Sequence, residues 1–143
     1  MSDTDTLVLP GDLRYDTHHQ WARWEDPEWR CGVTAWQAEA AGDMVYIGLP
    51  VVGSRVAAGE ELGSVESGKW VSSLFAPVGG VITSVNDVLR EDPQIVNRSP
   101  YDEGWVFTIH PSEELIGLDA ERYLEVIRAE EAADAPRIRE RAE

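Results

Sequence analysis

Short runs of β-branched and aromatic residues alternate with Gly and Pro along most of the chain, from Pro10 to Pro111. Runs of this length, bounded by turn-forming residues, are typical of a mostly β domain built from many short strands. The pattern predicts strands at 13–15, 21–25, 29–33, 44–48, 61–67, 70–75, 80–85 and 104–110. We therefore expect a mainly β fold with short connections.

One segment between the strands carries the signals of a short helix. Thr34 is suited to cap its first turn, and Gln37, three residues on, is suited to complete a capping box. Gly42 supplies a left-handed stop after the last turn. We expect this helix over 34–41.

A second helix is expected after the last strand, from about Asp119 to Ala132. Its apolar positions recur at helical spacing and form one stripe that should lie against a sheet, namely Ala120, Tyr123, Leu124 and Ile127. The residues beyond it are charged and include Pro136, which predicts a frayed tail over 133–143. With a flexible N-terminus at 1–12, we expect one domain over 13–132.

Charge and cysteine content narrow the classes of function. The 143 residues carry 12 basic and 27 acidic side chains, a formal net charge of −15, which repels nucleic acid and anionic lipid head groups. No apolar run could span a bilayer and no signal-peptide pattern is found, so we expect a cytoplasmic protein. We also expect it to be a monomer. The lone Cys31 is expected to be a small buried side chain.

A lysine stands between a glycine and a tryptophan in the stretch ESGKWVSSLFAPVGG, residues 66–80. Strand-like residues on both sides make Ser67-Gly-Lys-Trp70 a candidate two-residue hairpin loop. Glycine at the first central position is what a type II′ turn requires, because that position needs a positive φ. Lys69 would then point away from the sheet into solvent.

This stretch resembles the lipoyl-attachment region of the glycine-cleavage H-protein family, usually written E-S-x-K-x-x-x-x-x-x-A-P-x-x-G. The likeness extends over about residues 13–130, through LRYDTHHQW, part of GVTAWQAEAAGDMVYIGLPVVG, and QIVNRSPYDEGWVFTIHPS. The resemblance implies a barrel-sandwich hybrid of two small antiparallel sheets with a short internal helix and a C-terminal helix. It also implies lipoate in amide linkage on Lys69, and a carrier subunit rather than an enzyme.

Five further residues are implied at the lipoyl site. Glu66, three residues before the lysine, and Gly80, eleven after it, stand at the offsets associated with recognition by a lipoate–protein ligase. Gly68 shapes the hairpin, and Trp70 is placed to lie against an apolar thiolane. His19 matches a family histidine that borders the cleft for the arm. A rigid, exposed anchor suits a group that must meet a ligase and then visit other proteins.

Several positions depart from the family pattern, among them His18 where the family usually has Glu and Trp36 where it has Tyr. Gly68 stands where Val is common, Trp70 where Ala is common, and Ala35 where the family has Asp. Without that carboxylate, the groove is less suited to a cationic amine and more suited to a sulfur-rich cargo. We therefore expect similarity to the H-like lipoate-binding proteins of sulfur oxidation, with a heterodisulfide-reductase-like complex as partner. The alternative is glycine cleavage, with glycine decarboxylase, aminomethyltransferase and dihydrolipoyl dehydrogenase as partners.

Other classes of protein fit the residues less well. Biotinyl domains flank their lysine with methionines, but the only methionines here are Met1 and Met44. A freestanding enzyme needs a convergent acid–base or nucleophilic group, and none is found. His18 and His19 are adjacent and would point to opposite faces of a strand, and His110 is expected to be structural. An unmodified binding module would be recognised by the mass of the purified protein.

Overall fold

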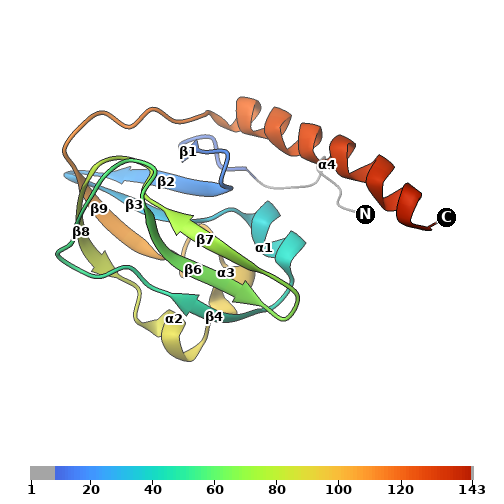
Figure 1. The fold of residues 1–143 in the computed structure, drawn as a ribbon. Coiled ribbons are helices and arrows are strands. Elements are labelled where there is room, and N and C mark those ends of the chain that lie inside the picture. Colours follow the sequence, from blue (N-terminus) through green and yellow to red (C-terminus); the bar gives the residue numbers. More distant parts are fainter. Residues whose placement is uncertain (1–8, 143) are drawn as a thin grey trace.

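The computed structural model describes residues 9–142, with side chains described as far as Ala133. The strands in this range are β1 Arg14–Tyr15, β2 Gln20–Glu25, β3 Glu28–Val33, β4 Met44–Gly48, β5 Arg55–Val56, β6 Glu61–Ser67, β7 Val71–Phe75, β8 Gly80–Val85 and β9 Phe107–Pro111. They form two antiparallel sheets, one ordered β1-β2-β3-β9-β8-β5 and the other β4-β6-β7 (Figure 1). The predicted fold class is confirmed.

Most of the predicted strands occur close to their expected bounds, with two differences. β5 was not predicted, because two residues are too few to show an alternating pattern; it is held by the pairing of Arg55 with Val81 and of Val56 with Gly80. The strand predicted at 104–110 begins only at Phe107, because residues 101–104 form a turn.

The helices in the described range are α1 Ala35–Ala41, α2 Val88–Glu91, α3 Ile95–Arg98 and α4 Ala120–Ala142. α1 was predicted correctly: the hydroxyl of Thr34 accepts a hydrogen bond from the amide of Gln37, and Gly42 has a φ of 83°. The predicted capping box is not completed, because the amide of Thr34 donates to the carbonyl of His19, at 3.0 Å, and not to the side chain of Gln37. α2 and α3 were not predicted, because a single turn is too short for helical periodicity.

α4 differs from the prediction at its C-terminal end. It continues past residue 132 and through Pro136 to Ala142, so the proline does not end the helix. A proline inside a helix removes one backbone hydrogen bond and costs about 3 kcal/mol. Ala, Glu and Arg, which have high helix propensity, make up most of 129–142 and favour continuation of the helix. No described helix is both long enough and apolar enough to cross a bilayer.

Two clusters of buried side chains hold the fold together. The main core contains apolar residues from both sheets, among them Cys31, whose burial raises the pKa of its thiol. The second cluster lies beneath α4, where Tyr123 stacks on Tyr15 with ring centroids 4.8 Å apart. Of the predicted apolar stripe, Tyr123 and Ile127 are buried, but Val126 rather than Leu124 packs beside them.

One side chain ties the two sheets together. The side-chain amide of Gln20, on β2, donates to the carbonyl oxygen of Phe75, and the backbone amide of Phe75 donates to Gln20 Oε1, both at 2.8 Å. The carboxamide therefore bonds to the end of β7 in the way a neighbouring strand would. Together with the core, it orients the β6–β7 hairpin relative to the larger sheet.

Candidate functional site

Lys69 lies exposed in the loop that joins β6 and β7. In Figure 1 this loop extends past the end of the sheet, beside the C-terminal end of α1. The Lys69 ammonium has no hydrogen-bond or ion-pair partner among the described residues. It is also the only lysine in the chain, because every other basic side chain is an arginine. The hairpin therefore presents a single, unpaired primary amine.

The loop is not the type II′ turn that we predicted. Gly68 does not have a positive φ, and three residues, 68–70, separate the strands. The buried side chain of Ser67 stabilises the loop instead: its hydroxyl oxygen lies 3.3 Å from the amide nitrogens of Lys69 and Trp70. The amide of Ser67 also donates to the carbonyl of Trp70 at 2.9 Å. Hydrogen bonds to the Ser67 hydroxyl therefore stabilise this loop, whereas we expected a glycine with a positive φ to shape it.

Substitution of Gly68 by valine is expected to be tolerated. A Cβ at this position would meet no atom within 4 Å, and φ is not in the left-handed region. We expect Gly68→Val to change the free energy of unfolding by less than about 1 kcal/mol. Urea unfolding followed by tryptophan fluorescence measures this. A loss of about 2 kcal/mol or more would mean that the loop does need glycine.

The Lys69 side chain lies over the end of α1. A Cβ on Gly42 would sit 3.6 Å from Lys69 Cε, an ordinary van der Waals distance, so the lysine side chain lies against this residue. A shallow, open groove continues from here and is lined by Ala41, Gly42, Asp43, Val45, Gly68 and Lys69. The groove gives the root of a group attached to Lys69 a mainly apolar surface to lie on.

Asn97, on α3, holds the wall of this groove in place. Its Nδ2 donates to the carbonyls of Ala38 and Gly42, at 3.2 and 2.9 Å. Its Oδ1 accepts from the amide of Met44 at 2.9 Å. One side chain thus binds the last turn of α1 to the start of β4. Sequence reasoning missed this role, although Asn97 lies within the segment QIVNRSPYDEGWVFTIHPS.

The structure brings some of the predicted site residues together and separates others. Glu66 is half-buried on β6, beside the loop, and the half-buried Trp70 packs against the main core. Gly80 is buried in the larger sheet, where it pairs with Val56 and Pro111. β8 lies far from the Lys69 loop in Figure 1. A role of Gly80 in ligase recognition stays a prediction, whereas its place in the sheet gives it a structural role.

His18 and His19 precede β2 and lie in a turn, not on a strand as we expected. The carboxylate of Asp16 forms this turn by accepting from the amides of His18 and Gln20. The exposed His18 ring stacks on Phe75, with ring centroids 4.1 Å apart. His19 has a φ of 63° and is buried, so the two rings diverge.

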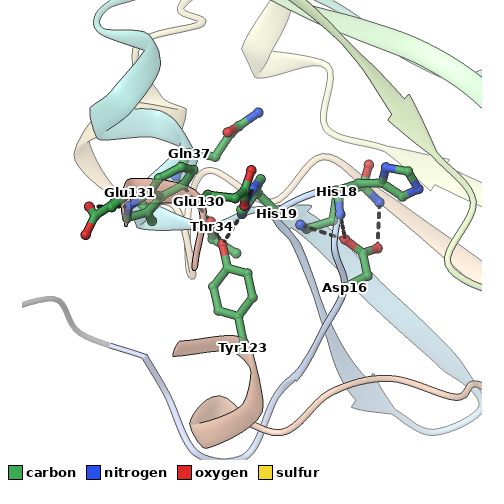
Figure 2. A network of polar contacts seen from close by, with 10 residues as sticks. Asp16, His18, His19, Thr34, Gln37, Tyr123, Glu130 and Glu131 are labelled. Carbon is green, nitrogen blue, oxygen red and sulfur yellow. Dashed lines mark hydrogen bonds and ion pairs between the residues drawn. The ribbon is translucent and has the colours of Figure 1, made fainter. Parts of the chain in front are cut away.

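His19 joins three elements through a buried polar network (Figure 2). Its Nδ1 lies 2.8 Å from the hydroxyl of Tyr123, which lies 2.7 Å from the hydroxyl of Thr34. Its Nε2 lies 2.6 Å from the carboxylate of Glu130 on α4. Trp36 lies beside the ring, with centroids 4.4 Å apart. His19 therefore helps to bind α4 to α1, and a place at the cleft for the arm stays a prediction.

A neutral His19 fits the hydroxyl side of this network. With its proton on Nε2, which lies 2.6 Å from the Glu130 carboxylate, His19 accepts from the hydroxyl of Tyr123 at Nδ1. The hydroxyl of Thr34 then donates to Tyr123 and accepts from the amide of Gln37. Burial lowers the pKa of His19, although the nearby Glu130 carboxylate opposes the shift. Burial also raises the pKa of the Tyr123 hydroxyl.

This lowered pKa predicts a loss of stability in mild acid. Between the folded-state pKa and the unfolded value of about 6.5, the unfolded chain binds more protons, so stability falls as the pH drops through that window. His19→Asn removes this titration, and asparagine tolerates the positive φ. Urea unfolding between about pH 7 and about pH 5 should therefore show a smaller pH dependence for His19→Asn than for the native chain. The exposed His18→Asn is the control, and an equal dependence in all three proteins would contradict the assignment.

The fold and the site together define a class of protein. It is a two-sheet β domain that presents one unpaired amine on a rigid hairpin, with the features of a carrier domain. The chain belongs to the glycine cleavage H-protein family, whose sequence profile matches residues 13–135. Glycine cleavage H proteins carry lipoate covalently on a lysine, and this chain has only one lysine that could serve.

Individual relatives agree with this assignment. The chain is 47% identical over 123 residues to the glycine cleavage system H protein of Teredinibacter turnerae, covering 83% of this chain and 95% of the relative. It is 46% identical over 107 residues to that of Anaeromyxobacter sp. (strain K), covering 75% and 84%. The crystal structure of a glycine cleavage system H protein from Mycobacterium marinum matches with a TM-score of 0.77 and 39% identity, covering 80% of this chain and 95% of that one.

These relatives correct our expectation of a role in sulfur oxidation. That expectation was wrong, because the similar proteins are glycine cleavage system H proteins. It rested on a few departures from the family pattern, among them Ala35, Gly68 and Trp70. The structure shows why two of these residues carried little information: Gly68 is exposed with open space around it, and Trp70 packs partly against the core. Neither substitution requires a change of fold or of lysine position.

Proposed function

We propose that this chain is the carrier subunit of a glycine cleavage system and has no catalytic residue of its own. Lys69 holds lipoate through an amide bond, and the chain carries an aminomethyl group from glycine decarboxylase to aminomethyltransferase. Dihydrolipoyl dehydrogenase then restores the oxidised state. The observation that carries this proposal is the exposure of the chain's only lysine, without a partner among the described residues, on a hairpin of an H-protein fold.

The residues around Lys69 fit such a group. The amine faces solvent, so an attaching enzyme can reach it, and the groove beside Gly42 accepts the root of the arm. When bound, lipoate supplies a disulfide whose sulfurs exchange with thiols and take up the transferred group. The protein's own contribution is presentation, since Ser67 and Asn97 stiffen the loop and the groove wall.

The proposal is tested by the mass of the full chain after expression with an active lipoate–protein ligase. We expect an increase of one lipoyl group, located on Lys69 by peptide mapping. The modified protein should then support glycine-dependent release of CO₂ when combined with the three partner enzymes, whereas unmodified protein should not. A mass equal to that of the bare polypeptide, or modified protein without activity in that mixture, would overturn the proposal.

A further inference from the structure

The outer face of the small sheet carries two exposed apolar side chains beside the lysine. Tyr46 on β4 pairs with Glu66 on β6, and Glu66 pairs with Val71 on β7. Residues paired across antiparallel strands lie on the same face, so these three form one row. Their neighbours Ile47 and Val65 face the core. Tyr46 is 55% exposed and Val71 64% exposed, so an apolar surface flanks Glu66 on both sides.

The side-chain carboxylate of Glu66 has no hydrogen-bond or ion-pair partner among the described residues, although the residue is half-buried. A carboxylate between two apolar side chains is complementary to a cation that another molecule presents within an apolar surface. The partner that fits this row therefore presents a basic side chain surrounded by apolar surface. The formal net charge of −15 favours the approach of such a partner.

The position of the row says which partner must touch it. Glu66 and Val71 lie three residues before and two residues after Lys69. An enzyme that acylates the lysine must bring its activated carbonyl within about 3–3.5 Å of Nζ, so it must lie against the strands that hold this loop.

We propose that Tyr46 and Val71 form the docking surface for the enzyme that attaches lipoate to Lys69, with a basic side chain of that enzyme paired to Glu66. This inference rests on the proposed function. In the attachment step, an amide bond forms between Nζ and the carboxyl carbon of a lipoyl adenylate. The bond from that carbon to the phosphate oxygen breaks, AMP leaves with the electron pair, and the ammonium nitrogen releases two protons.

Initial rates of modification test the docking surface. The unmodified full-length chain is mixed with purified lipoate–protein ligase, lipoate and ATP, and the double variant Tyr46→Ser/Val71→Ser is compared with the native sequence. We expect kcat/KM to fall by roughly tenfold or more, mainly through a higher KM, while long incubation still gives complete modification. Unchanged circular dichroism and an unchanged unfolding midpoint show that the variant is folded.

Val51→Ser is the matched control, because Val51 is 73% exposed but lies in the turn after β4. It should leave kcat/KM unchanged. The inference is overturned if the double variant reacts like the native chain or if Val51→Ser slows the reaction equally. It is also overturned if fully lipoylated double variant loses glycine cleavage activity, since the surface would then serve those enzymes. If instead the native chain is never modified on Lys69, the proposed function itself fails.

Discussion

Lys69→Arg is expected to abolish lipoylation completely while leaving the fold intact. Arginine keeps the positive charge at this exposed loop, but its guanidinium stays protonated and is not acylated as an amine. No other lysine remains to take the group. Because the Lys69 ammonium has no partner among the described residues, replacement of this side chain should change the free energy of unfolding by less than about 0.5 kcal/mol. Intact mass after expression with the ligase, together with urea unfolding, measures both effects.

A second variant tests whether the hairpin position matters or merely the presence of a lysine. Lys69→Arg/Arg55→Lys again has a single lysine, now on the exposed position 55 of β5 in the larger sheet. We expect this protein to stay unmodified, because an attaching enzyme reads the strands and loop around the amine. Lipoylation at position 55 would contradict the assignment of the hairpin as the recognised element.

Gly80→Ala is expected to lower the free energy of unfolding by about 3 kcal/mol. A Cβ at Gly80 would lie 2.1 Å from the carbonyl oxygen of His110, on the paired strand β9. That contact is with backbone, so it can be relieved only by moving β8 away from β9. Gly68→Ala is the matched control, since a Cβ there meets nothing within 4 Å. Urea unfolding of both variants gives the comparison.

The same pair of variants distinguishes two reasons why position 80 is a glycine, namely packing in the sheet and recognition by the ligase. If Gly80→Ala is modified slowly but is also destabilised, the strand contact accounts for the need for glycine. A Gly80→Ala protein with native stability and impaired lipoylation would instead indicate direct recognition by the ligase. Native stability would also show that the sheet accommodates the extra methyl group.

Local patterns predicted the elements that depend on adjacent residues. Thr34 and Gly42 marked the ends of α1 because capping involves residues only a few positions apart. The family motif placed Lys69 on a hairpin, where the structure has it. The predicted turn type was wrong, because the buried hydroxyl of Ser67, and not the conformation of Gly68, stabilises the loop.

The biological pathway was the weakest sequence inference. It rested on a few substitutions in segments that frame the groove, and one of them, Gly68, has open space around it. Overall similarity to glycine cleavage system H proteins outweighs those positions. The count of lysines was the more informative signal, because it leaves one candidate for attachment.

The sequence alone therefore determined the β character of the chain, the bounds of α1 and the place of the only lysine, since each depends on residues close together in the chain. The tertiary structure decided what holds the site in place. Gln20 meets Phe75 across 55 positions, and His19 meets Tyr123 across 104. Gly80 is constrained by the carbonyl of His110. Such contacts depend on how strands and helices pack against one another. A local pattern of residues does not specify which distant residues will meet.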